Sequence, residues 1–307
     1  MGYLGPVEEA GPPAAREQIF VSYGRRDGAE AAEELCALLE DHGYRVWLDK
    51  RDIPAGSMFP TRIQEGIEGS KLLVAVLTPW SVRPESWCLD EWVHARTSQV
   101  PILPVRFVDG IDPPLPIARF SYIDVFGDQE GAFAEVLAQI EVIRRTGKSP
   151  TREFGVDPPW WTRVERPDFG AELGRHVGRF VGRGWLFDLL RERIREPDTR
   201  VILLTGATGI GKTAIAAQAA VRLNVRGVHF CSRRIDRSCR PESWLAGLVH
   251  QLALQFPAYG EQLESMPEPD WQDTRSIFRT VVADPLKRVE SSIDISEPLV
   301  FVVDGLD

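Results

Sequence analysis

The stretch Lys71-Leu72-Leu73-Val74-Ala75-Val76-Leu77 decides the fold class of this chain. Its continuously apolar middle is typical of a strand at the centre of a parallel sheet, where helices cover both faces. Shorter apolar runs flank it, and segments with helical periodicity separate them. Strict alternation of strands and helices predicts right-handed crossovers and a doubly wound α/β domain over residues 17–146. The expected strands are 19–23, 45–48, 71–77, 100–105 and 122–125, and the expected helices are 29–42, 59–69, 85–98 and 132–145.

A second α/β pattern begins near Phe180 and predicts a second parallel-sheet domain over residues 178–307. Residues 147–177 between the two patterns lose the periodicity. We predict a linker or a docking segment there, in which the adjacent Trp160 and Trp161 pack against one of the domains because two indoles are costly to leave in water. In the second domain, the expected strands are 200–205, 227–231 and 299–303, and the expected helices are 186–195, 211–223 and 242–255.

Length and charge narrow the class of protein. The chain has 307 residues, about twice a typical single domain, and a formal net charge of -9 at pH 7. The acidic balance argues against a nucleic-acid partner, although residues 175–240 hold fourteen Lys and Arg against five Asp and Glu. We interpret this basic segment as solvated surface and nucleotide contacts. Residues 1–16 are rich in Gly, Pro and Glu, and we predict a disordered N-terminus without a signal peptide.

The four cysteines lie far apart and form neither a CxxC pair nor a Cys/His zinc pattern; they are Cys36, Cys88, Cys231 and Cys239. This spacing predicts buried, reduced thiols and a cytoplasmic location. No apolar run approaches the roughly 20 residues that a membrane helix requires, so no membrane partner is expected.

The eight residues from Gly206 to Thr213 fit the pattern G-x-x-x-x-G-K-[ST], with an expected strand before them and an expected helix after them. In such a loop Gly206, Gly209 and Gly211 let backbone N–H groups turn toward phosphate oxygens, and the helix N-terminus adds positive potential. Lys212 would neutralise the β- and γ-phosphates, and Thr213 would ligate Mg²⁺. The alternative is a plain glycine-rich turn, but the Lys-Thr pair favours a nucleotide site.

The last expected strand is followed by Asp304, an acid that could hold the water shell of the metal. Together with Arg183 in segment 180–183 and the stretch 228–234, the loop resembles the signal-transduction ATPases of the NACHT and NB-ARC type over residues 178–307. That resemblance implies a switch that binds ATP or ADP with Mg²⁺, contacts the nucleotide through Arg183 and oligomerises. The family's sensor strand, helical lid and sensing repeats are missing, so a longer parent protein is expected. The choice between NACHT and NB-ARC stays open.

Two residues early in the expected helix 85–98 stand four positions apart, Trp87 and Glu91, and therefore share one face of that helix. An aromatic plane beside a carboxylate can stack a base while the carboxylate engages a ribose or an oxocarbenium-like centre. The same spacing also occurs in a half-buried anchor next to a solvated charge, so the pair alone decides nothing.

The wider pattern resembles a TIR domain over nearly all of residues 17–146. Its parts, in order, are Ile19-Phe20-Val21-Ser22-Tyr23, Trp47-Leu48-Asp49 with Asp52-Ile53-Pro54-Ala55-Gly56, Ile67-Glu68-Gly69-Ser70 and Ser86-Trp87-Cys88-Leu89-Asp90-Glu91-Trp92. The resemblance implies a flavodoxin-like fold in which Glu91 cleaves the nicotinamide–ribose bond of NAD⁺ and Trp87 helps to bind the dinucleotide. It also implies NAD contacts from Ser22, Tyr23 and Arg25 near the first strand, and from Phe59 at the end of a mobile loop 49–59.

The sequence allows three roles for Glu91: a nucleophile, an anchor for a ribose hydroxyl, or an electrostatic partner of a developing positive charge. The product is either linear ADP-ribose or a cyclised variant. The joint reading is a TIR effector wired to a nucleotide switch, which self-associates through both domains when a missing C-terminal region senses an unknown trigger. By analogy with such fusions, the setting would be innate immunity, with NAD depletion in bacterial antiphage defence. The competing hypothesis is a non-catalytic adaptor that recruits partners through TIR–TIR contacts.

Overall fold

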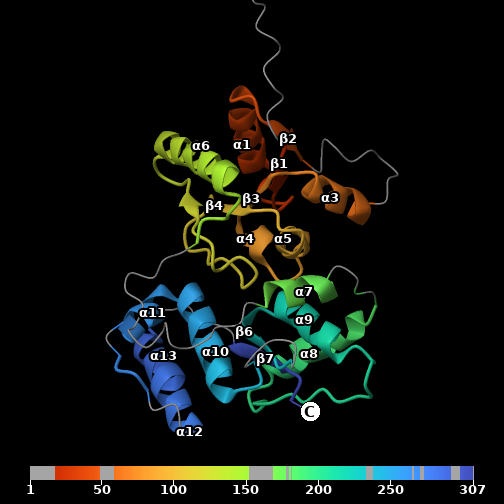
Figure 1. Ribbon diagram of the computed structural model, residues 1–307, viewed down its shortest axis with the longest axis vertical. Coiled ribbons are helices and arrows are strands. Elements are labelled where there is room, and N and C mark those ends of the chain that lie inside the picture. Colours follow the sequence, from red (N-terminus) through yellow and green to blue (C-terminus); the bar gives the residue numbers. More distant parts are fainter. Residues whose placement is uncertain are drawn as a thin grey trace, which may run out of the picture.

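The computed structural model describes residues 18–48, 59–151, 169–177, 180, 182–232, 238–264, 266–269, 273–291 and 298–306. They form two α/β units, which occupy the upper and lower halves of Figure 1. The predicted disordered N-terminus 1–16, most of the loop 49–59, the two tryptophans of the linker and Asp307 lie outside the described residues.

The first unit is a five-stranded parallel sheet with the strand order β2-β1-β3-β4-β5. All six residues of the central strand β3 are buried, as its apolar sequence predicts. The doubly wound α/β prediction for this unit is therefore confirmed. The strands are β1 (Gln18–Ser22), β2 (Arg45–Trp47), β3 (Leu72–Leu77), β4 (Ile102–Arg106) and β5 (Ile123–Asp124).

Helices cover both faces of this sheet. Helices α1 (Ala29–Asp41) and α6 (Gln129–Thr146) pack on one face, where their apolar side chains join alternate residues of β1 and β3 in one cluster. Helices α3 (Phe59–Glu68) and α5 (Trp87–Thr97) pack on the other face, and the short α4 (Pro79–Val82) precedes α5. Alternation along each strand thus assigns neighbouring residues to opposite cores.

The second unit is built around two parallel strands, β6 (Val225–Phe230) and β7 (Val300–Asp304). Its helices surround this pair in Figure 1. They are α7 (Gly170–Val177), α8 (Gly184–Arg195), α9 (Lys212–Arg222), α10 (Pro241–Gln255), α11 (Pro257–Glu264), α12 (Thr274–Ile277), a π-helical segment (Phe278–Ala283) and α13 (Asp284–Val289).

The predicted strand 200–205 is wrong in this structure. These residues form neither a strand nor a helix and pair with no strand among the described residues, and Val201 and Leu203 are 84% and 75% exposed. A strand is stabilised by its ladder of hydrogen bonds to a neighbour, and among the described residues the sheet of this unit holds only β6 and β7. The apolar run predicted burial, but no strand in the described part of this unit lies beside it.

The end of the predicted linker contains a packed helix. Helix α7 lies between α5 of the first unit and α9 of the second (Figure 1). Phe169 and Leu173 of this segment are each only 4% exposed, and one apolar cluster runs through them from α5 to α9. The described end of this stretch thus contacts both units, while the predicted packing of Trp160 and Trp161 lies outside the described residues.

The prediction of buried thiols holds for half of the cysteines. Cys36 and Cys88 are buried in the first unit, whereas Cys231 is half-buried and Cys239 is exposed. All four are free thiols, as expected. Burial raises the pKa of the Cys231 thiol, with smaller contributions from Cys239 and Asp304.

Candidate active site

Helix α5 carries both residues of the predicted pair. It begins after Ser86, whose side-chain oxygen accepts a hydrogen bond from the backbone N–H of Cys88 at 3.2 Å and so caps the helix. Trp87 in the first turn is 61% exposed, whereas Glu91 one turn later is 9% exposed. The pair is thus a surface indole above a buried carboxylate.

The Glu91 carboxylate is held from the sheet. Ser22 at the end of β1 donates its hydroxyl proton to Glu91 Oε2 at 2.5 Å. Trp92 donates its indole N–H to the same Ser22 oxygen at 2.9 Å. Since Trp92 is fully buried, this chain of two hydrogen bonds fixes one carboxylate oxygen against a rigid core.

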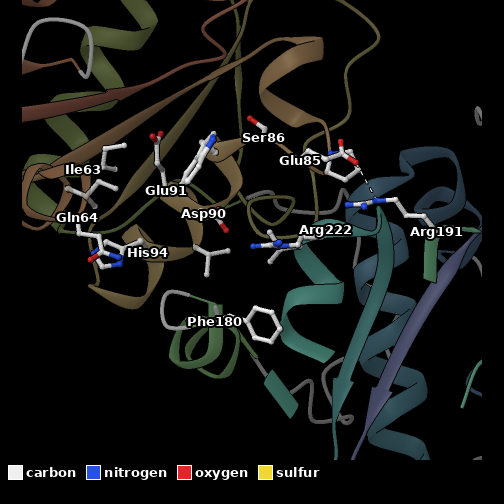
Figure 2. Close-up of a pocket in the computed structure, with 16 residues that line it drawn as sticks. Ile63, Gln64, Glu85, Ser86, Asp90, Glu91, His94, Phe180, Arg191 and Arg222 are labelled. Carbon is white, nitrogen blue, oxygen red and sulfur yellow. Dashed lines mark ion pairs between the residues drawn. The ribbon is translucent and has the colours of Figure 1, made fainter. Parts of the chain in front are cut away.

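A cavity of about 490 Å³ lies beside α5, within the size range of small-molecule sites. Trp87, Asp90, Glu91 and His94 line it from α5. Figure 2 shows Asp90, Glu91 and His94 on one side of the hollow, with Phe180, Arg191 and Arg222 across from them. The opposing residues belong to the second unit. The cavity is therefore shared between the two units.

The charges around this cavity are arranged in pairs. Arg191 Nε lies 3.4 Å from Glu85 Oε1, across the two units. Burial raises the pKa of Asp90, while the positive charge of Arg222 acts in the opposite direction. Within the first unit, His94 Nε2 contacts Glu68 Oε1 at 3.0 Å. Negative charge from the first unit thus faces positive charge from the second.

The structure brings only some of the predicted NAD-binding residues to this cavity. Ser22 reaches it through its bond to Glu91. Tyr23 alternates to the opposite sheet face, where it packs in the cluster under α1 and α6, so this residue does not reach the cavity. Arg25 is exposed in the loop after β1 and is not among the lining residues. The side chain of Phe59 lies outside the described residues.

Sequence reasoning missed Trp92 and the arginines of the second unit. Trp92 directly follows Glu91, and its position on the buried side of α5 was a usable signal. Arg191 and Arg222 are separated from α5 by about a hundred residues and more in the sequence, and no local pattern points to them.

The phosphate-loop residues form a compact turn at the start of α9. Gly209 and Gly211 have φ values of 82° and 98°, a left-handed conformation that favours glycine. Lys212 Nζ donates to the Gly206 carbonyl at 2.8 Å, and Arg183 Nη2 donates to the Ile210 carbonyl at 2.9 Å.

The remaining predicted metal ligands lie on two different elements. Thr213 is half-buried in the first turn of α9, and Asp304 is the last residue of β7. The backbone carbonyl of Asp304 accepts a hydrogen bond from the N–H of Cys231 at 2.9 Å. A cavity of about 360 Å³ lies beside the loop, lined in part by Arg183 and Gly211.

Comparison with known families defines the class of each unit. Residues 19–138 match the family model described as TIR domain, and residues 184–307 match the model described as nephrocystin 3, N-terminal. The chain thus carries a TIR domain followed by a nephrocystin 3 N-terminal region. Within the described residues, every helix is too short or too polar to span a membrane.

Individual relatives match parts of the chain. The NAD(+) hydrolase tir-1 of Caenorhabditis elegans is 34% identical over 79 residues, which is 25% of this chain and 8% of that protein. The chain therefore spans a small fraction of the length of this relative. Among solved structures, one match is to the TIR domains in the structure of the activated Roq1 resistosome directly recognizing the pathogen effector XopQ. That chain is 18% identical with a TM-score of 0.28, and the match covers 42% of this chain and 76% of that one. The CMP N-glycosidase BcmB of Clostridium botulinum is 14% identical, with a TM-score of 0.30 over 40% of this chain and 99% of that one.

Proposed function

We propose that the TIR domain is an NAD⁺ glycohydrolase and that Glu91 is its catalytic carboxylate. The observation that carries this proposal is the Glu91 carboxylate, fixed by Ser22 at the wall of a cavity of about 490 Å³, one helical turn from the exposed indole of Trp87. The relative tir-1 supports the choice of substrate, because it is named as an NAD(+) hydrolase.

The proposed chemistry needs only one well-placed carboxylate. The bond between the ribose anomeric carbon and the pyridinium nitrogen breaks, and its electron pair leaves on neutral nicotinamide. The negative charge of Glu91 stabilises the positive charge that develops on the ribose. Water then adds to the anomeric carbon and releases a proton, which gives ADP-ribose, or an adenine nitrogen adds in its place, which gives a cyclic product. The indole of Trp87 offers a face on which a base can stack.

The test is nicotinamide release from NAD⁺ by the purified chain and by Glu91→Gln, which keeps the shape of the side chain and removes its charge. We expect a loss of about 100-fold or more, because electrostatic stabilisation of this kind is commonly worth that much. Glu135→Gln, at an exposed carboxylate on α6, is the matched control and should retain full activity. Equal rates in the chain and in Glu91→Gln would leave the non-catalytic adaptor as the better account.

For the second unit, we propose an adenine-nucleotide switch with Mg²⁺. Three features of the loop suit a phosphate group: its left-handed glycines, the Lys212 ammonium bonded to the Gly206 carbonyl, and the Arg183 guanidinium bonded to the Ile210 carbonyl. Thr213 and Asp304 would hold the Mg²⁺, which would neutralise phosphate charge when bound. Nucleotide binding would gather TIR domains by self-association in the cytoplasm, in an immune response to a trigger sensed elsewhere.

The switch is tested by thermal unfolding with and without ATP and Mg²⁺. ATP should raise the melting temperature of the parent chain but not that of Lys212→Ala, because a ligand stabilises only the protein that binds it. Arg145→Ala, at an exposed cation on α6, is the control and should keep the ATP-dependent shift. Equal shifts in the parent and Lys212→Ala would contradict the nucleotide site.

A further inference from the structure

At Gly174, helix α7 approaches α5 too closely for a side chain at that position. A Cβ added at Gly174 would lie 1.5 Å from Thr97 Oγ1 and 2.6 Å from Thr97 Cβ. Real Cβ atoms never come so near, so glycine is required at this position while the two helices stay in contact. The α5–α7 contact is therefore sensitive to one residue.

The same contact is packed like a core. Phe169, just before α7, sets its ring edge-on against His229 and Phe230 of β6, with centroid distances of 5.1 and 5.4 Å. Leu173 of α7 joins the cluster that includes Trp92 of α5. Because apolar burial is favourable in proportion to its area, this interface is a stable part of the described fold.

Charged groups fix the second unit against α5 in one orientation. The Arg191–Glu85 pair spans the two units at 3.4 Å, and Figure 2 shows Arg222 extending toward Asp90. Half-exposed pairs of this kind contribute little to stability. Their role here is alignment, and both guanidinium groups face carboxylates of the TIR domain.

Helix α9 connects this interface to the phosphate loop. It begins at Lys212 and ends at Arg222, which lines the cavity with Glu91. Eleven residues of α-helix span about 16 Å, so a rigid element joins the two places. A rearrangement at the loop would move the wall of the cavity.

From these contacts we infer that the second unit is an inhibitory cover on the TIR domain, which closes the far wall of the Glu91 cavity through the α5–α7 contact. The inference rests on the proposed hydrolase. Separation of the units would open the flank of α5 to a dinucleotide and to a second TIR domain. The cover would thus restrain the hydrolase until the second unit moves.

The test compares two leucine substitutions in the whole chain. Gly174→Leu should force the units apart and raise nicotinamide release about tenfold or more, with faster hydrogen exchange along α5. Gly184→Leu, at a glycine of α8 with nothing within 4 Å of an added Cβ, should change neither quantity. The increase should disappear in Gly174→Leu combined with Glu91→Gln.

The outcomes separate the two proposals. Faster exchange along α5 with equal or lower activity in Gly174→Leu would overturn the cover alone, and lower activity would make the second unit part of the substrate site. No NAD⁺ cleavage by either the parent or Gly174→Leu would overturn the hydrolase and the cover with it.

A charge reversal covers the case in which Gly174→Leu does not fold. Arg191→Glu should raise activity two- to fivefold, and Arg191→Glu combined with Glu85→Arg should return it to the parent level. The same activity in the single and double variants would contradict the role of this pair and with it the cover.

Discussion

Strand β3 of the TIR domain and residues 201–204 of the second unit are both apolar runs, yet they differ completely in exposure. Each side chain of β3 is at most 3% exposed, whereas Val201 and Leu203 are 84% and 75% exposed. Strand β3 is bonded to β1 on one edge and to β4 on the other. An apolar sequence alone therefore does not secure the burial of a strand, because burial also needs partner strands and the helices that cover them.

The largest expected effect lies in the well-paired strand. Val74→Asp would place an unpaired carboxylate in a site with no solvent exposure, at a cost of about 4 kcal/mol. Urea unfolding followed by circular dichroism should show the TIR domain unfolded or close to its midpoint in water. A melting curve like that of the parent would mean that β3 is less enclosed than its contacts indicate.

A smaller effect is expected at the end of β1, where Ser22 holds the Glu91 carboxylate in place. Ser22→Ala removes the hydroxyl between Trp92 and Glu91 and should cost about 1 kcal/mol of stability. Since the carboxylate loses its fixed position, kcat should fall about tenfold while KM stays nearly constant. Steady-state kinetics on NAD⁺ measure this split, and Ser22→Thr should retain most of the activity. A change in KM alone would assign Ser22 to substrate binding.

The second unit should be the more acid-sensitive region. His229 is 2% exposed, and burial lowers its pKa below the ordinary 6.5, although the bond from Nε2 to the Ser238 carbonyl acts the other way. The unfolded chain binds a proton near pH 6.5 that the folded chain resists, so folding stability falls as the pH drops below about 6.5. His229→Gln should reduce that fall, because the amide does not titrate. Equal pH profiles of thermal unfolding in the two proteins would contradict this.

The smallest effect is expected in the exposed run. Leu203→Ser should change the free energy of unfolding by no more than about 0.5 kcal/mol, because its side chain is already in water. Leu73→Ala, in the fully buried β3, is the contrasting variant and should cost about 2–5 kcal/mol. A large loss in Leu203→Ser would show that residues 201–204 pair with a strand in the solution state.

Much of the candidate site could be predicted from the sequence. The positions of Trp87 and Glu91 on one helix follow from their spacing, and the turn at Gly209 and Gly211 follows from the loop pattern. Trp92 was missed and Tyr23 was assigned to the wrong side of the sheet, because the side of a helix or strand that faces the core is set by packing. The second-unit arginines at the cavity could not be found, because long-range contacts leave no local pattern.

The sequence by itself determined the alternation of strands and helices, the central strand and the residues that carry the proposed chemistry, since these depend on local periodicity and on motifs a few residues long. Only the tertiary structure decided that residues 201–204 stay exposed and that α7 binds the two units together. It also decided that Arg222 faces the cavity of Glu91. The physical reason is that pairing and docking join residues far apart in the chain, so their outcome depends on which surfaces meet.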